Sequence, residues 1–530
     1  MSRSAPKSIP ASKFFSFYLL LTTGLCGAIV MVVEVLGSRV IGPFFGVSLF
    51  VWTSLITVTL VALAFGYAFG GWLADRRGSP AVLYAIVLAA GVCVLAIPVL
   101  QASVLSACVG LGLRTGSLLA SGLLFGPSLF FLGCVSPFLV RLVAVELRSL
   151  GRTVGGLYAL STIGSFVGTV VTGFFLIGVL GVSRIFLLAG MVLLTLGAGY
   201  FVAFRRQWLV AVLLPIAFLL APKDVLPDKV LADGTRASVI EKRDSFYGNL
   251  RVVDYRFAEK HTRELAIDGL IQGGGDVATG LSVYEFTYPL QFLPRALHPA
   301  GRSSLVIGLG AGFVPRWYAA QGIATEVVDI DPEVANLARK HFNFPAAIPV
   351  HIEDARHFLT RITTRYDYIV LDVFNGDTTP GHLLSVEAMQ LIEQRLNPQG
   401  VLAINLIGSL QRDNFMTASV IRTLQSVFER VDIYPVMAQN ALDKVGNLTV
   451  IAYRGAQRTP DATLYASEPI HPMARDVLRQ ALITRFSFPP NTPAIILTDD
   501  FNPIDVRDLW MKEDVRRNIL ENTDASILIG

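Results

Sequence analysis

Six stretches in the first half of the chain are apolar over the length that an α-helix needs to cross a lipid bilayer. They lie at roughly 14–36, 48–73, 81–100, 116–143, 155–180 and 182–204. A spanning helix requires about 20 mostly apolar residues, and the first run is too long for a signal peptide. Lipid offers no partner to backbone polar groups, so such runs must be helical. The sequence therefore predicts a multi-pass α-helical membrane domain over residues 14–222, behind a cytoplasmic tail of residues 1–13.

Two further segments leave the number of spans open between six and eight, with about seven expected. Residues 208–221 are apolar but short and contain Pro215, and residues 102–113 read as a loop, a re-entrant piece or an eighth span. Basic residues favour the cytoplasmic side. They fall at alternate ends of the first six spans, at the amino terminus, Arg76-Arg77, Arg141, Arg148, Arg152 and Arg205-Arg206. We expect a multi-pass protein of the cell membrane whose soluble domain faces the cytoplasm, provided that 208–221 does not cross or that 102–113 forms an eighth span.

Composition separates this region from the rest of the chain. Apolar residues make up 53% of the chain and charged residues only 16%, values too hydrophobic for an ordinary soluble protein. A polar linker at 223–234 precedes a normally charged second half. The net charge of +4 gives no indication of a nucleic-acid partner, and none is expected. All four cysteines lie in the apolar segments, and their spacing matches no metal site, so no metal is expected.

Residues 235–295 read as a small antiparallel β domain with a lead-in helix. Apolar and polar residues alternate between Ala237 and Ile267, which is typical of half-buried strands. Asp268-Gly269 lies between two such runs and predicts a tight hairpin turn. We expect Gly273–Asp276 to be a flexible loop, followed by a helix that starts at Tyr284.

Residues 296–530 begin with the pattern of a nucleotide-binding half-sheet. An apolar strand at 305–307 runs into a turn with Gly308, Gly310 and Gly312, then a helix at 314–321, and a second strand that ends at Asp329. Glycines at these positions let the backbone approach a ligand, and an acid about 20 residues on can accept ribose hydroxyls. The sequence predicts an α/β Rossmann-like fold, of the S-adenosylmethionine methyltransferase-like type.

Two more acids favour an S-adenosyl ligand over NAD, which the glycine spacing alone does not separate. Asp354, followed by Ala355, closes a third segment, and Asp372 ends a fourth strand at 366–371. Ligands bind at the carboxyl ends of such strands.

The carboxyl-terminal half, over roughly residues 235–450, resembles the spermidine synthases, which are polyamine aminopropyltransferases. The matching phrases are Asp268-Gly269-Leu270-Ile271-Gln272, Tyr284-Glu285, Gly308 to Gly312, Asp329-Ile330-Asp331, Asp354-Ala355 and Asp372. The rest of the chain is similar to the membrane-fused bacterial members. That similarity is carried by Glu34, Arg39, Trp52, the Gly71–Arg76 phrase and the Leu497–Pro503 phrase.

The resemblance implies transfer of an aminopropyl group from decarboxylated S-adenosylmethionine to putrescine or a related polyamine, giving spermidine and methylthioadenosine. The donor is a co-substrate, and no prosthetic group is implied. Asp372 would take a proton from the attacking amine, Asp329 would hold the ribose, and Asp354 the adenine amino group. Gly308, Gly310, Gly312 and Ala355 would shape the nucleoside site, while Gln272, Tyr284 and Asp377 would contact the acceptor. A lipid bilayer is the expected partner, and a homodimer is an open alternative.

Three departures from the family pattern keep other functions open. Ala311 stands where the family usually has an aspartate, Gly248 replaces a glutamine, and the second acid after the fourth strand is displaced to Asp377. One alternative is an S-adenosylmethionine-dependent methyltransferase on the same fold. The other is a transporter or sensor that binds a polyamine or nucleoside without turnover.

Overall fold

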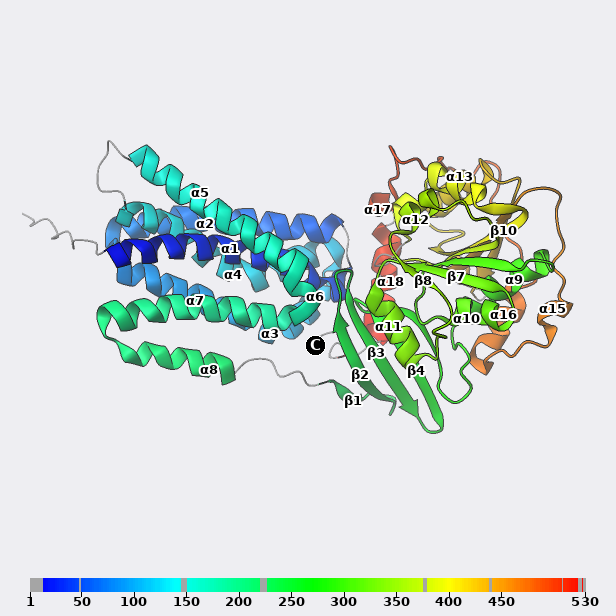
Figure 1. Ribbon diagram of the computed structural model, residues 1–530, viewed down its shortest axis with the longest axis horizontal. Coiled ribbons are helices and arrows are strands. Elements are labelled where there is room, and N and C mark those ends of the chain that lie inside the picture. Colours follow the sequence, from blue (N-terminus) through cyan, green and yellow to red (C-terminus); the bar gives the residue numbers. More distant parts are fainter. Residues whose placement is uncertain are drawn as a thin grey trace, which may run out of the picture. The chain divides into compact units, whose positions relative to one another are not determined.

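A computed structural model describes residues 13–46, 49–143, 150–219, 226–374, 379–437, 441–507, 509–522 and 527. The chain forms two compact units that divide at Asp224. They are drawn together in Figure 1, and each is described by itself below.

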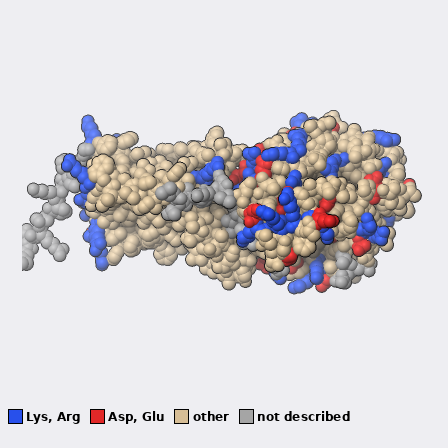
Figure 2. Space-filling view, turned by 90° about the horizontal axis from the view of Figure 1, so that it is seen from below, with Lys and Arg blue, Asp and Glu red and all other residues tan. Residues whose placement is uncertain are grey.

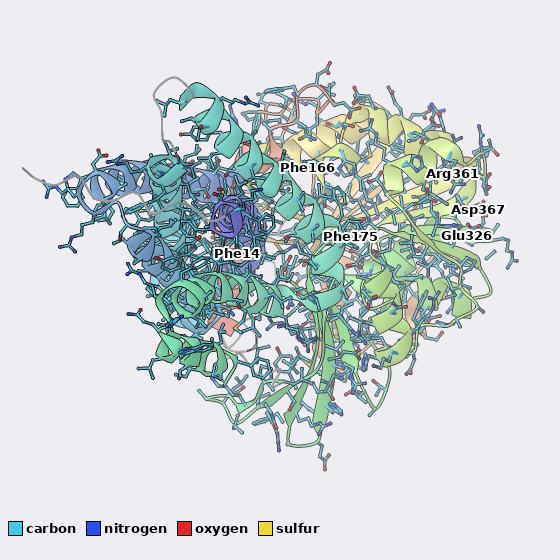
Figure 3. All side chains as sticks on the ribbon, turned by 60° about the vertical axis from the view of Figure 1, so that its left-hand side comes forward. Phe14, Phe166, Phe175, Glu326, Arg361 and Asp367 are labelled. Carbon is cyan, nitrogen blue, oxygen red and sulfur yellow. The ribbon has the colours of Figure 1, made fainter. Side chains whose placement is uncertain are left out.

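The first unit is a bundle of apolar helices. Six of them are long and apolar enough to cross a membrane. Figure 2 shows that Lys and Arg gather at one end of this unit and are scarce along its length. Outward-facing side chains are large and apolar, as Figure 3 shows for Phe166 and Phe175, which are 66% and 61% exposed. The helices are α1 (Lys13–Phe45), α2 (Leu49–Arg77), α3 (Pro80–Val109), α4 (Gly112–Val143), α5 (Leu150–Val171), continued by a π-helical turn and α6 (Ile177–Leu180), and α7 (Val182–Arg205).

Two segments of uncertain role are now placed within this unit. Residues 102–113 are neither a separate loop nor a re-entrant piece, because α3 continues to Val109 and α4 begins at Gly112. The prediction was wrong because an apolar run indicates only the part of a helix that can lie in the bilayer. Helices α3 and α4 both continue beyond their apolar runs and take up residues 102–113 almost completely. The short seventh candidate forms a 3-10 turn at Trp208–Val212 and α8 (Leu213–Leu219), well short of a spanning length.

The second unit opens with a five-stranded antiparallel sheet in the order β1 to β5. The predicted hairpin is confirmed, since Asp268 and Gly269 both have positive φ, +48° and +81°, between two paired strands. Gly273–Asp276 was wrongly predicted as a loop, because these residues complete β5 and pair with β4. The strands are β1 (Asp228–Val230), β2 (Arg236–Asp244), β3 (Asn249–Phe257), β4 (Lys260–Ile267) and β5 (Leu270–Asp276).

A seven-stranded sheet follows, in the order β11-β12-β10-β9-β6-β7-β8. Strands β10, β9, β6, β7 and β8 are parallel, and β12 is antiparallel to both β10 and β11. The strands are β6 (Ser303–Ile307), β7 (Ala324–Asp329), β8 (Val350–Ile352), β9 (Tyr366–Leu371), β10 (Leu396–Gly408), β11 (Arg430–Val436) and β12 (Gly446–Tyr453).

Helices cover both faces of this sheet, and alternate side chains of each strand enter one of two cores. Ile307 and Leu371 pack with α12, α13 and α14, whereas Val306 and Val370 pack with α9, α10 and α11. The larger helices are α9 (Thr287–Leu297), α10 (Phe313–Ala320), α11 (Pro332–His341), α12 (Ala355–Arg361), α13 (Val386–Gln394), α14 (Phe415–Gln425) and α18 (Leu509–Asn522). The predicted fold class is thereby confirmed: a helical bundle, a small β-sheet and a Rossmann-like domain.

The strand order places a topological switch between β6 and β9. The chain leaves β6 toward β7 on one side and reaches β9 on the other. Doubly wound sheets bind ligands outside the carboxyl ends of the strands at such a point.

Candidate active site

The turn after β6 requires glycine at two of its positions. Gly308 and Gly310 have φ of +93° and +52°. A Cβ at Gly308 would lie 2.0 Å from the backbone oxygen of Asp372, and one at Gly310 would lie 2.4 Å from that of Gln272. Glycine therefore brings the turn against both β9 and β5. Gly312, at the start of α10, abuts Phe344 instead and does not line the cavity described below.

Asp329 ties the glycine turn to the end of β7. Its Oδ2 accepts a hydrogen bond from the backbone N–H of Leu309 at 2.8 Å, and its Oδ1 accepts one from Asp331 N–H at 2.9 Å. Burial raises the pKa of Asp329 to about 6, although these backbone hydrogen bonds act to lower it. Each carboxylate oxygen keeps a second lone pair, so the group can still accept ribose hydroxyls.

Asp354 and His382 stand on another side of the site. Asp354 caps α12, since its Oδ1 accepts from His357 N–H at 2.9 Å, and its Oδ2 lies 3.3 Å from His382 Nε2. Arg356 holds the backbone oxygen of His382 and also pairs with Asp499. The conspicuous Leu497–Pro503 phrase thus supports the chain segment around His382.

Asp372 follows β9 directly, and its backbone N–H donates to the Ile307 carbonyl at 2.8 Å. Its Oδ1 accepts a hydrogen bond from Asn405 Nδ2 at 2.9 Å. Burial raises the pKa of Asp372 to about 6, and the Asn405 hydrogen bond opposes that rise. A carboxylate with a pKa near neutrality can exchange a proton in either direction at working pH.

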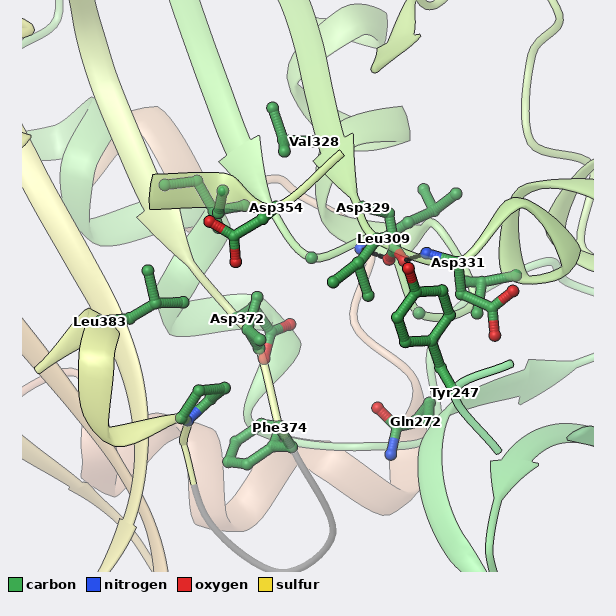
Figure 4. A pocket seen from close by; sticks show the side chains of 18 of the residues that line it. Tyr247, Gln272, Leu309, Val328, Asp329, Asp331, Asp354, Asp372, Phe374 and Leu383 are labelled. Carbon is green, nitrogen blue, oxygen red and sulfur yellow. Dashed lines mark hydrogen bonds between the residues drawn. The ribbon is translucent and has the colours of Figure 1, made fainter. Parts of the chain in front are cut away.

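These side chains surround one cavity of about 220 Å³ (Figure 4). Apart from the glycine turn and several aliphatic and aromatic groups, six carboxylates line it: Asp268, Asp329, Asp331, Glu353, Asp354 and Asp372. No Lys or Arg among the residues that the structure describes is part of this lining, and His382 is its one basic side chain there. Glu353 is already paired with Arg361 and His357, and the other carboxylates make the cavity suited to a positively charged ligand.

The structure brings most of the predicted site residues together. Those that line the cavity are Gln272, Gly308, Gly310, Asp329, Asp354, Ala355 and Asp372. Tyr284 is not among them, because its hydroxyl is buried and donates to Glu264 Oε1 at 2.6 Å. Burial raises the pKa of that glutamate to about 7. Asp377 lies outside the described residues.

Sequence reasoning left out several cavity residues. Asp331 and Glu353 lie within two residues of Asp329 and Asp354, which the sequence analysis did select. A search for acids within two residues of each strand end would have included them. Tyr247, on the loop between β2 and β3, and Asp268, in the hairpin turn, enter only through the packing of the small sheet. Asn405 does not line the cavity but donates to Asp372, and it has no local signal because it lies inside strand β10.

Comparisons with known proteins agree with the predicted resemblance. Residues 286–456 match the family model described as "Spermine/spermidine synthase domain". The chain is 27% identical over 217 residues to a polyamine aminopropyltransferase of Vibrio vulnificus, covering 39% of this chain and 70% of that protein. It is 28% identical over 249 residues to polyamine aminopropyltransferase 2 of Pseudomonas aeruginosa, covering 42% and 69%.

A third relative has a different name. Over 157 residues the chain is 38% identical to an N-terminal histidine N-methyltransferase of Emericella nidulans, and the match spans 29% of this chain and 27% of that protein's length. Among solved structures, a probable spermidine synthase from Corynebacterium glutamicum is 20% identical, with 45% of this chain and 86% of that chain covered and a TM-score of 0.38.

Proposed function

We propose that this chain, which carries a spermine/spermidine synthase domain over residues 286–456, is a membrane-anchored aminopropyltransferase. It would transfer the aminopropyl group of decarboxylated S-adenosylmethionine to putrescine or a related polyamine, releasing methylthioadenosine. The observation that carries the proposal is the cavity lining of six carboxylates without Lys or Arg among the described residues. The decarboxylated donor bears a sulfonium and an ammonium, and the acceptor is also cationic. S-adenosylmethionine has a carboxylate that this lining repels.

The nucleoside half of the donor fits the side of the cavity formed by β6, β7 and α12. The glycine turn exposes backbone at close range, and Asp329 is proposed to accept the ribose hydroxyls. Asp354 would accept from the adenine amino group in place of His382. Leu309 and Ile330 line the same wall and offer apolar surface to the adenine ring.

Asp372 is proposed to receive the proton that the reaction releases. A neutral amine nitrogen attacks the carbon next to the sulfonium; the new C–N bond forms, the C–S bond breaks, and its electron pair stays on the sulfur of methylthioadenosine. The nitrogen then carries a proton in excess, which passes to the Asp372 carboxylate. A sulfonium is already a good leaving group, so positioning and proton transfer are the protein's main contributions.

The acceptor is proposed to lie on the β5 side of Asp372. Gln272 lines this part of the cavity, and among the residues that the structure describes its side-chain amide makes one long hydrogen bond, 3.5 Å, to the Leu270 carbonyl. It is therefore available to a substrate amine. A contact of Tyr284 with the acceptor stays a prediction, because its hydroxyl is engaged with Glu264. The role of Asp377, a homodimer and a cytoplasmic catalytic domain also stay predictions.

The six long apolar helices support anchoring in a bilayer. Methyl transfer from S-adenosylmethionine is the second candidate function, and two observations favour it. Ala311 stands in the glycine turn without the acid usual in aminopropyltransferases, and one relative is named as a histidine N-methyltransferase.

Product analysis separates the two candidates. The full chain in detergent is incubated with each donor and a panel of amines, and products are identified by mass spectrometry. Aminopropyl transfer gives methylthioadenosine from the decarboxylated donor, whereas methyl transfer gives S-adenosylhomocysteine from S-adenosylmethionine. Asp372→Asn should lose turnover and keep nucleoside binding, while Asp367→Asn, at the other end of β9, should keep turnover. Binding without either product would contradict both candidates and favour a non-catalytic binder.

A further inference from the structure

A directed chain of side-chain amides ends on Asp372. Asn447 Nδ2 donates to Asn405 Oδ1 at 2.9 Å, and Asn405 Nδ2 donates to Asp372 Oδ1 at 2.9 Å. Asn447 and Asn405 lie on the paired strands β12 and β10, and Asp372 directly follows β9, which pairs with the other edge of β10. The chain therefore crosses the sheet at its ligand-binding edge.

The two hydrogen bonds from Asn447 to Asn405 and from Asn405 to Asp372 can run in only one direction when Asp372 is ionised. Asn405 is 1% exposed, so its amide group has no water to turn to. The ionised Asp372 carboxylate can only accept hydrogen bonds, so it holds the NH₂ of Asn405 toward itself. The oxygen of Asn405 then faces Asn447, whose NH₂ satisfies it. A flip of Asn405 would set its oxygen against the carboxylate in a buried place, which is costly.

This donor affects both the charge and the geometry of Asp372. A hydrogen bond to the ionised carboxylate stabilises it against burial, which otherwise favours the neutral acid. It also occupies Oδ1, which leaves Oδ2 for a proton from the substrate. The other titratable groups that line the cavity are Tyr247, Asp268, Asp329, Asp331, Glu353, Asp354 and His382. Among the described residues none of these groups hydrogen-bonds to Asp372, so Asn405 is the side chain that acts on it directly.

We propose that Asn405 and Asn447 are positioning residues that set the proton affinity of Asp372 and direct its free oxygen at the acceptor amine. The inference rests on the proposed function, in which Asp372 takes the proton.

The sheet contains a matched pair that serves as a control. At the opposite ends of the same two strands, Asn397 Nδ2 donates to Asp367 Oδ1 at 2.7 Å. Asp367 is labelled in Figure 3, and it does not line the cavity. Asn397→Leu therefore removes an equivalent Asn-to-Asp hydrogen bond between β10 and β9 without touching the site.

The test compares Asn405→Leu, Asn447→Leu and Asn397→Leu in the full chain. The first measurement is the pH dependence of kcat/KM with the decarboxylated donor and putrescine. Asn405→Leu should move the acidic limb up by about one pH unit, because the carboxylate loses its donor. Asn447→Leu should move it in the same direction by less, and Asn397→Leu should leave it in place.

A second measurement needs no turnover. The ratio of affinities for decarboxylated S-adenosylmethionine and uncharged methylthioadenosine is followed by calorimetry from pH 5 to 8. Asp329 acts on both ligands through the ribose and cancels from the ratio, so a change in the ratio between the wild type and the asparagine variants reports on Asp372. The pH at which this affinity ratio falls should rise in Asn405→Leu and in Asn447→Leu. Asn447→Leu keeps Asn405 in place, so it still tests the inference if Asn405→Leu fails to fold.

The two failures are distinguishable. The inference is overturned if neither the acidic limb of the kcat/KM profile nor the affinity ratio changes in Asn405→Leu and Asn447→Leu. It is also overturned if Asn397→Leu shows the same shift. In both cases turnover by the wild type still upholds the proposed function. A wild type that binds both nucleosides and turns over no amine contradicts the proposed function, and the affinity ratio still decides on the inference.

Discussion

Replacing the carboxylate of Asp372 with an amide should make the fold more stable while it abolishes turnover. Burial raises the pKa of Asp372 to about 6 from its ordinary 3.8. Because the folded-state pKa exceeds the unfolded one, the neutral acid favours the fold at low pH, and this contribution is lost as pH rises through about 6. Asp372→Asn retains an oxygen for the Asn405 hydrogen bond and removes the buried charge.

The magnitude follows from the two pKa values. They differ by about 2 units, and one unit corresponds to about 1.4 kcal/mol, so the charged form lowers the free energy of unfolding by up to about 3 kcal/mol above pH 6. Asp372 lines an open cavity, and water screening reduces this figure. We expect Asp372→Asn to gain about 1 to 3 kcal/mol at pH 8 and about half as much at pH 5.

Asp367, at the start of the same strand, supplies a control of opposite sign. Burial alone would raise its pKa, but hydrogen bonds from the backbone N–H of Arg302 and from Asn397 outweigh this and hold the pKa below the ordinary value. That contribution is present at neutral pH and is lost as pH falls through the lowered pKa. Asp367→Asn should therefore destabilise the fold at pH 8.

Pulse proteolysis of the full chain in urea, at pH 5 and pH 8, measures the unfolding of the catalytic unit directly. A loss of stability in Asp372→Asn at pH 8, or an equal gain at both pH values, would show that the Asp372 carboxylate bears no burial cost. A stabilised variant that also keeps full turnover would refute its role as proton acceptor.

Three further changes test other parts of the site. Gly308→Ala places a Cβ 2.0 Å from a backbone oxygen at the end of β9, so calorimetry should detect no methylthioadenosine binding; Gly322→Ala has a similar φ but open space around it and should bind normally. Asp329→Asn should weaken methylthioadenosine binding about 10- to 100-fold, the cost of losing hydrogen bonds to a charged acceptor; an unchanged affinity would remove Asp329 from the ribose site. Asp499→Asn breaks the pair with Arg356, and since that pair is partly exposed we expect only a few-fold rise in the donor KM with kcat unchanged.

The fold class was readable from the sequence because its signals are local. Runs of apolar residues specify spanning helices, and the strand-turn-helix order around Gly308 specifies a Rossmann-like half-sheet. The errors arose where partners distant in sequence decide the structure. Gly273–Asp276 has loop composition, yet β4 pairs with it, and a Cβ at Gly274 would lie 2.7 Å from Glu264 Cγ. The glycine at position 274 leaves room for the Glu264 side chain of the paired strand and does not indicate a flexible backbone.

The same division holds for the site. The sequence places Asp329, Asp354 and Asp372 near one another because strand ends are recognisable and converge at one sheet edge, and in the structure all three line one cavity. The contact of Asn405 with Asp372 could not be predicted, since it depends on strand order, which no local pattern specifies. Tyr284 matched a family phrase, but its hydroxyl faces Glu264 in the structure. Matching a motif assigns the residue type to a position and does not assign the direction of the side chain.

Ala311, which stands where the family usually has an aspartate, packs closely against Gly273 of β5. Ala311 is 3% exposed, and a Cβ built at Gly273 would lie 3.1 Å from the Ala311 Cβ, so two small residues let the strand and the glycine turn touch. A longer side chain at position 311 would need the space that Gly273 occupies. Under the proposed function, recognition of the cationic donor would then depend on carboxylates that already face the cavity, and Asp372 is one of these. If Asp372 both attracts the donor's positive charge and receives the acceptor's proton, it must be ionised when the donor binds and still basic enough to accept a proton. The hydrogen bond from Asn405, supported by Asn447, can adjust its proton affinity between these two requirements.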